Sequence, residues 1–162
     1  MADMLVKLFK IDCFDIEKEK ELLKEGIRIK KALAPDLEKV KEFARIYGGD
    51  NWASEVYAAF AKHPVSCYIA THNKQIIGFA CYEATAKAFF GPTAVKEEFR
   101  KKGIGKALLM RSLFSLKELG YGYAFIGMPS SKAIHFYESA TGGVMIDEDG
   151  SGIYTQMIEI DE

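Results

Sequence analysis

The chain of 162 residues is 49% hydrophobic and 28% charged, which suits one globular domain with a sizeable core and excludes a second full domain. Its formal net charge of −1 argues against a nucleic-acid partner or an anionic membrane surface, because the basic residues cluster locally and do not dominate the composition. The chain is therefore expected to form a single domain, 1–162, with a local positive charge.

The first 26 residues are predicted to form an N-terminal extension of this domain. A short strand is expected at 4–11 and a charged helix at 15–24, which Asp15 begins. Both precede the first strand of the expected core, at 27–31, where apolar and charged residues alternate.

The core is predicted to combine strands and helices. Pro35 and Asn51 each open a helix, because proline suits the first helical turn and asparagine caps helix N-termini. The strands at 88–95 and 121–128 are expected to be parallel, since a helix connects them. The expected core elements after residue 31 are helices at 35–47 and 51–62, strands at 65–71, 75–82 and 88–95, a helix at 104–119, a strand at 121–128, a helix at 131–140, and strands at 144–147 and 153–160.

A basic, glycine-bearing segment joins the strand at 88–95 to the helix at 104–119. Gly103 and Gly105 let the backbone approach a ligand, and the first helical turn leaves N–H donors without intrahelical partners. The surrounding cations are Arg100, Lys101, Lys102 and Lys106. Because the helix dipole and the free amides both favour negative charge, this segment is predicted to bind a diphosphate group.

Two common phosphate-binding patterns do not match this segment. A P-loop requires G-x-x-x-x-G-K-[ST], whereas Gly105 is followed by Lys106 and Ala107. A dinucleotide fingerprint requires a third glycine at the position of Leu108 and a strand-bound acid about twenty residues later. A different phosphorylated ligand, such as a nucleotide, stays open as an alternative, and its binding would not depend on an acetyl group.

The segment Arg100-Lys101-Lys102-Gly103-Ile104-Gly105 resembles the acyl-CoA loop of the GNAT N-acetyltransferase superfamily, Arg/Gln-x-x-Gly-x-Gly/Ala. The preceding strand end, 91–95, is similar to the strand before that loop. Residues 133–138, followed by Gly142 and Gly143, are similar to the second motif, Asn-x-x-Ala-x-x-x-Tyr with a glycine turn, although Ser130 replaces the asparagine. The resemblance covers the order of elements from 27 to 160, with specific motif matches at 93–109 and 133–143.

The resemblance implies a mixed α/β (α+β) fold, the GNAT-like acyl-CoA N-acyltransferase fold, with a mostly antiparallel central sheet, one parallel crossover and helices on both faces. It also implies an acyltransferase of EC class 2.3.1 that moves an acetyl group from acetyl-CoA, its cosubstrate, directly to a primary amine without a metal. The pantetheine arm is expected to pair with strand backbone. The residues expected to bind CoA are Ala94, Val95, Arg100, Lys101, Lys102, Gly103, Ile104, Gly105, Lys106 and Ser130.

The resemblance implies a catalytic role for Tyr137, which occupies the tyrosine position of the second motif and would stabilise the leaving thiolate. A neutral amine also needs a proton acceptor, but the strand at 88–95 contains no ionisable side chain where many relatives carry an acid. Glu83 is the nearest acidic candidate. Glu55 and His72 rank behind it, and ordered water is a further option. Two alternatives stay open for Trp52, Tyr57 and Phe60: they line an acceptor pocket, or they pack in the core.

The acceptor is expected to be a small-molecule or peptide amine, with no nucleic acid and no membrane as partner. Cys13, Cys67 and Cys81 have no CxxC spacing, so neither a disulfide framework nor a zinc site is expected. With no signal-peptide pattern and no apolar run of ~18 residues, a cytoplasmic location is expected. The identity of the acceptor and the oligomeric state, a homodimer included, stay open. Because the central strand lacks an acid, a catalytically silent CoA-binding sensor or interaction module is the alternative to an enzyme.

Overall fold

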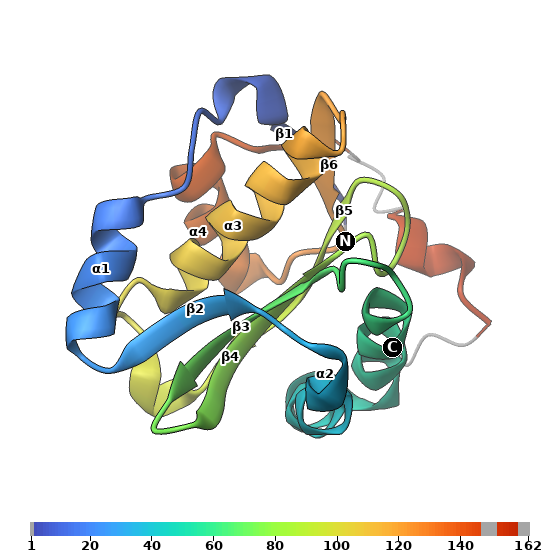
Figure 1. Ribbon diagram of the computed structural model, residues 1–162. Coiled ribbons are helices and arrows are strands. Elements are labelled where there is room, and N and C mark those ends of the chain that lie inside the picture. Colours follow the sequence, from blue (N-terminus) through green and yellow to red (C-terminus); the bar gives the residue numbers. More distant parts are fainter. Residues whose placement is uncertain (1, 147–151, 159–162) are drawn as a thin grey trace.

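The computed structural model describes residues 2–146 and 152–158 (Figure 1). Its centre is a seven-stranded sheet with the order β2-β3-β4-β5-β6-β1-β7. The strands are β1 (Met4–Lys7), β2 (Ile27–Lys31), β3 (Cys67–His72), β4 (Gln75–Tyr82), β5 (Phe89–Val95), β6 (Tyr123–Ile126) and β7 (Val144–Met145). The helices are α1 (Ile16–Lys24), α2 (Leu37–Phe60), α3 (Ile104–Glu118) and α4 (Ser131–Thr141).

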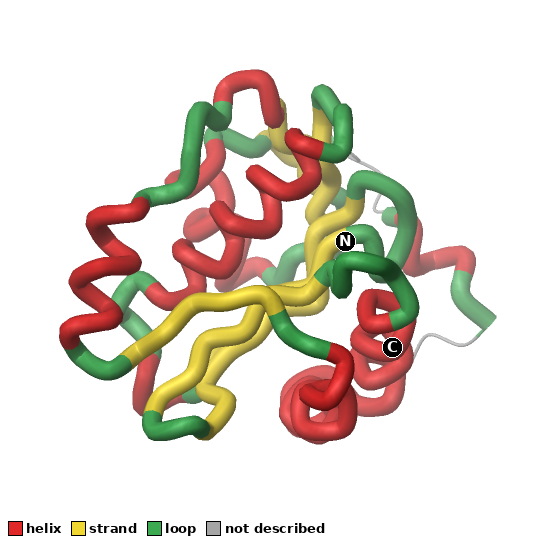
Figure 2. The backbone as a smooth tube through the Cα atoms, in the orientation of Figure 1, coloured by secondary structure: helices red, strands yellow, loops and turns green. Residues whose placement is uncertain are grey.

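The pairing of the strands confirms the expected mixed sheet. β5 and β6 are parallel and α3 connects them, whereas the other described pairs are antiparallel. Figure 2 shows the strands as one layer with helices on both sides. Side chains of β4 alternate between the two faces, so that Ala80 joins the cluster packed on α1, α3 and α4, and Cys81 joins the cluster packed on α2.

α2 is broken at a glycine pair that lies between the two helices expected at 35–47 and 51–62. Gly48 and Gly49 have non-helical backbone angles, with φ of −137° and 65°. A Cβ on Gly48 would lie 2.0 Å from the Trp52 ring, so this position requires glycine for the indole to fold back against it. The two predicted helices are therefore two helical segments on either side of a kink. Of the described helices, none combines the length and the apolarity needed to cross a lipid bilayer.

The N-terminal strand lies inside the sheet. β1 pairs with β6 on one side and with β7 on the other, both antiparallel. Met4, Val6 and Leu8 are fully buried. The strand is shorter than the predicted 4–11, because a 3₁₀ turn, Leu8–Lys10, follows it directly.

The predicted strand at 153–160 is wrong where it can be compared. Residues Ile153–Gln156 form a 3₁₀ turn, while 159 and 160 lie outside the described residues. The Ile153 N–H donates to the Asp3 carboxylate at 2.9 Å, and β7 finds its strand partner in β1. Of the predicted strand at 144–147, Val144 and Met145 form β7, and Asp147 lies outside the described residues.

α1 is fixed to the rest of the molecule by packing and by charge. Asp15 caps it by accepting from the Lys18 N–H at 2.9 Å, as expected for an N-cap. Glu19 accepts two hydrogen bonds from the Arg111 guanidinium of α3, at 2.8 and 2.7 Å. Leu22 is buried in the core beside them.

Two adjacent leucines of α1 provide a matched test of this packing. Leu22 is 1% exposed and Leu23 is 51% exposed. Leu22→Ala is expected to lower the free energy of unfolding by about 2–5 kcal/mol, because it leaves a cavity in the core. Leu23→Ala should change it by less than about 0.5 kcal/mol. Urea denaturation of both variants measures the difference, and equal effects would show that α1 is not packed as described.

Candidate functional site

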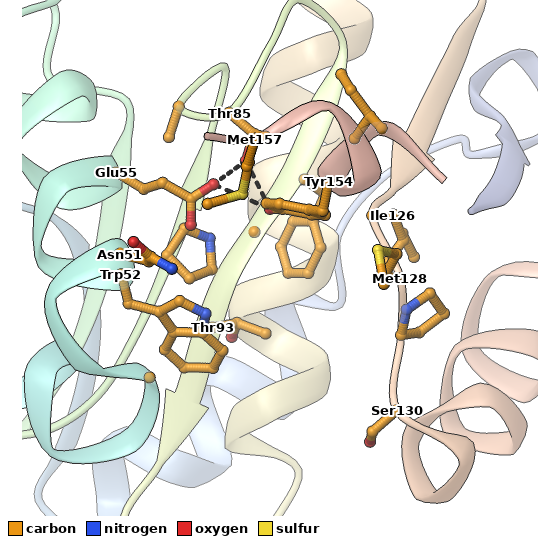
Figure 3. Close-up of a pocket in the computed structure, with 18 of the residues that line it drawn as sticks. Asn51, Trp52, Glu55, Thr85, Thr93, Ile126, Met128, Ser130, Tyr154 and Met157 are labelled. Carbon is orange, nitrogen blue, oxygen red and sulfur yellow. Dashed lines mark hydrogen bonds between the residues drawn. The ribbon is translucent and has the colours of Figure 1, made fainter. Parts of the chain in front are cut away.

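A cavity of about 880 Å³ opens at the point where β5 and β6 stop pairing (Figure 3). The two strands pair at Phe89 with Phe125 and at Phe90 with Ile126, and the described residues beyond these no longer pair with each other. Residues 90–93 line the cavity from β5, and residues 126–130 line it from the end of β6 and the following turn. Parts of α2, α4 and the segment 152–158 complete the walls.

The backbone of β5 beyond Phe90 is paired on one side. Thr93, Ala94 and Val95 pair with β4. On the side of β6 the same stretch has no strand partner within the described residues, so its peptide groups can pair with an extended ligand, apart from the Val95 carbonyl, which accepts from Arg100. The expected pairing of pantetheine with Ala94 and Val95 stays a prediction.

Gly103 shapes the loop that follows β5. It is the N-cap of α3 and has a φ of 87°, a conformation that favours glycine. The N–H groups of the first turn, starting at Ile104 and Gly105, have no intrahelical acceptor. Lys18 of α1 also lies at this loop, because a Cβ on Gly103 would be 2.7 Å from Lys18 Cε. No sequence pattern indicates Lys18, since α1 precedes the loop by some eighty residues and its contact with the loop is tertiary.

The loop cations differ in what they contact. Arg100 Nε donates to the Val95 carbonyl at 3.0 Å, which ties the loop to the end of β5. Lys102 Nζ forms an ion pair with Glu25 at 3.1 Å. The side chains of two further cations, Lys101 and Lys106, are exposed. The loop therefore offers both free positive charge and helix N–H groups to an anion.

Tyr137 and Ser130, the two candidate residues of the second motif, both line the cavity. Ser130 is the N-cap of α4, and Tyr137 lies two turns further along that helix with 8% of its surface exposed. The Phe90 ring packs edge-on against Tyr137, with centroids 6.2 Å apart. Burial raises the pKa of the Tyr137 phenol to about 12, so this group keeps its proton at neutral pH.

Glu83, the first candidate for the proton acceptor, does not line the cavity. Its carboxylate accepts from the Ala88 N–H at 2.6 Å, and its own N–H donates to the Phe89 carbonyl. Glu83 therefore closes the loop between β4 and β5. His72 also lies away from the cavity, where its ring packs against Phe99 with centroids 5.3 Å apart.

For three aromatic side chains the sequence leaves two alternatives, the core or an acceptor pocket. The structure assigns a different place to each of them. Trp52 lines the cavity. Phe60, the last residue of α2, is buried in the core, and Tyr57 is 61% exposed and lies outside the cavity lining. Among the described residues, no group of three His, Cys, Asp or Glu side chains is placed to hold a metal ion.

Glu55 points from α2 into the cavity toward Thr85 and Tyr154 (Figure 3). It accepts a hydrogen bond from the Tyr154 hydroxyl at 2.9 Å and another from Thr85 Oγ1. Burial raises the pKa of the Glu55 carboxyl, and the two hydrogen bonds oppose part of that rise. Sequence reasoning ranked Glu55 low and missed Tyr154, because nothing local indicates which face of α2 meets the C-terminal segment.

Comparison with solved structures shows the same fold. The N-acetyltransferase region of a fungal multi-domain GH3 β-N-acetylglucosaminidase matches with a TM-score of 0.65 and 13% identity, over 90% of this chain and 19% of that one. A GCN5-related N-acetyltransferase from Sphaerobacter thermophilus matches with a TM-score of 0.64 and 18% identity, over 90% of this chain and 48% of that one. The chain thus spans about a fifth and about half of these two relatives.

A GNAT family acetyltransferase from Brucella melitensis, solved in complex with acetyl-CoA, matches with a TM-score of 0.52 and 18% identity, over 68% of this chain and 80% of that one. No curated protein matches the sequence significantly. The sequence profile of the acetyltransferase (GNAT) family matches residues 31–142, which include β5, the basic loop, α3 and α4. On this match, which covers more than half of the chain, the protein belongs to the GNAT acetyltransferase family.

Proposed function

We propose that this protein transfers an acetyl group from acetyl-CoA directly to a primary amine. The observation that carries the proposal is the cavity between β5 and β6, which brings Tyr137 and Ser130 next to the unpaired backbone of β5. The basic loop begins at the far end of the same strand. A CoA ester can therefore extend along β5, with its diphosphate at the N-terminus of α3 and its acyl end in the cavity.

Tyr137 acts as a hydrogen-bond donor to the sulfur as the thiolate leaves. With a pKa of about 12, compared with ~8.5 for a thiol, full proton transfer from Tyr137 would be uphill by about 5 kcal/mol. Donation of a hydrogen bond involves no such transfer and stabilises the negative charge that develops on sulfur. The proton that sulfur finally receives originates from the attacking amine.

Removing the Tyr137 hydroxyl tests this role. Tyr137→Phe is expected to lower kcat by about 10²–10³-fold, the usual loss for one donor to a developing anion. The Kd of acetyl-CoA should stay within about twofold, since the ring and its packing are kept. Tyr123→Phe, which alters a 48% exposed tyrosine of β6 outside the cavity, is the matched control. Steady-state release of CoA measures kcat, and an unchanged value would remove Tyr137 from the reaction.

A substitution at Gly103 tests whether the basic loop binds the diphosphate of the acetyl donor. Alanine at φ of 87° introduces about 1–2 kcal/mol of strain at the turn that presents the helix N–H groups, and its Cβ would displace Lys18. Gly103→Ala is expected to raise the Kd of acetyl-CoA and of CoA by about tenfold. Gly120→Ala is the control, because Gly120 has a similar φ of 101° at the other end of α3.

Calorimetry with acetyl-CoA, CoA and ATP measures these affinities. Retained binding in Gly103→Ala would overturn the assignment of the loop. Tight binding of ATP to the unaltered protein would favour the nucleotide alternative.

Lys18 adds a cation from α1 to the same site. Lys18→Ala is expected to raise the Kd of acetyl-CoA by about three- to tenfold at low salt, because a charge near the diphosphate is lost. Lys20→Ala removes a lysine of the same helix that pairs with Glu17 at 2.9 Å, and it should leave the Kd unchanged. If both substitutions raised the Kd of acetyl-CoA equally, Lys18 would act only through the net charge of α1 and not through a position at the loop.

One observation favours the catalytically silent alternative. β5 carries no acidic side chain, and Glu83 is engaged with the Ala88 N–H. If acetyl-CoA binds but a broad panel of amines elicits no CoA release, a CoA-binding sensor on the same fold replaces the enzyme.

A further inference from the structure

The cavity has a single charged side chain among its described lining residues. Glu55 is that residue, and the other polar groups on the walls are hydroxyls and amides. A half-buried carboxylate without a neighbouring cation is unfavourable, so it marks a place where a positive ligand would be stabilised.

The carboxylate of Glu55 is oriented by two hydroxyl groups. Tyr154 and Thr85 both donate to Oε1, and they are 2.9 Å from each other. Within the described part of the chain Oε2 accepts no hydrogen bond. One oxygen is thus held by the protein while the other is left for a ligand.

On the side of α2, the cavity lining next to Glu55 contains the Trp52 ring and the amide of Asn51. Trp52 precedes Glu55 by three residues and therefore lies on the same helical face (Figure 3). Its indole is held over Gly48 and packs edge-on against Phe79, with centroids 6.3 Å apart. An apolar body next to the carboxylate would contact this ring.

The segment 152–158 forms the outer wall and limits the space. Asp3, 7% exposed, accepts from the Ile153 N–H at 2.9 Å and from the Met128 N–H at 3.0 Å, and so joins this segment to the turn after β6. The cavity of about 880 Å³ must admit both the acyl end of the donor and the acceptor, which limits the size of an acceptor that lies wholly inside it.

We propose that Glu55, oriented by Thr85 and Tyr154, is the ammonium-binding group and proton acceptor of the acceptor site, and that the acceptor is a small amine with one positive charge and no anionic group. This inference rests on the proposed acetyltransferase function. A carboxylate or phosphate on the acceptor would meet Glu55 without a compensating cation on the described walls.

The ammonium donates to Oε2 and passes one proton to Glu55, which leaves a neutral amine. Its lone pair forms the C–N bond with the acetyl carbon, and the C–S bond breaks with its electron pair going to sulfur. A second N–H proton leaves nitrogen and ends on sulfur, and Glu55 releases its proton to solvent. The products are an amide, the CoA thiol and one proton. Burial, which raises the pKa of Glu55, makes it a better proton acceptor than an exposed carboxylate.

The first experiment removes the charge of Glu55 and keeps its size. Glu55→Gln is expected to raise the Kd of butylamine for the complex of the protein with CoA by about tenfold or more, because a charge-assisted hydrogen bond is lost. The Kd of CoA itself should not change. With acetyl-CoA, kcat/KM for butylamine should fall by about 100-fold. Glu42→Gln, at an exposed glutamate of the same helix, is the matched control and should alter none of these values.

The second experiment compares acceptors in the unaltered protein. 5-Aminopentanoate is butylamine with a terminal carboxylate, and its kcat/KM is expected to be lower by about tenfold or more. A blocked lysine peptide carries the same amine on a larger body and should also be a poorer acceptor. A preference for either over butylamine would overturn the proposed acceptor class.

Calorimetry and turnover measurements distinguish a failure of the proposed acetyltransferase function from a failure of the proposed acceptor site. If acetyl-CoA binds but none of the amines is acetylated, the acetyltransferase function fails. If amines are acetylated, but butylamine does not bind to the CoA complex or binds equally to Glu55→Gln, the acceptor site fails and the function stands. Melting temperatures of Glu55→Gln and Glu42→Gln within about 4 °C of the unaltered protein show that both variants fold.

Discussion

The early end of pairing between β5 and β6 is the constraint on which the rest of the site depends. Two parallel strands that pair over two residues and then stop leave peptide groups of β5 without a strand partner, and such groups need another partner when a ligand or side chain excludes water. The same opening creates the cavity. It also places the turn after β6, and with it Ser130 and Tyr137 of α4, opposite the exposed edge of β5. The unpaired edge of β5 and the position of the Tyr137 phenol, the two features on which the proposed function rests, thus have one structural cause.

The position of β1 in the sheet determines how the far side of the cavity is built. β1 lies between β6 and β7, so β7 obtains its partner from the N-terminus of the chain. The segment at 152–158 is therefore free to pack over the cavity, where Asp3 holds the Ile153 N–H. Through this contact the residue just before β1 fixes the wall that carries Tyr154. A residue near the N-terminus and the segment 152–158 thus together build this wall of the cavity.

The cations lie at one end of the site and the carboxylate of Glu55 at the other. Lys101, Lys106 and Lys18 lie at the loop, where the N-terminus of α3 adds its dipole. Glu55 lies in the cavity with its pKa raised by burial. Glu83, by contrast, accepts from the Ala88 N–H and does not line the cavity.

The sequence alone determined the features that depend on neighbouring residues. The φ of Gly103, the break at Gly48 and Gly49, the cap at Asp15 and the parallel crossover around α3 all follow from local backbone preferences and periodicity, and the structure contains each of them. The strand predicted at 153–160 failed because Ile153–Gln156 form a 3₁₀ turn, whose first N–H is held by the distant Asp3 carboxylate. Only the tertiary structure decided that Glu55 meets Tyr154, 99 residues away, and that Glu83 turns from the cavity. Which side chains converge depends on how the sheet is ordered, and no short stretch of sequence encodes that order.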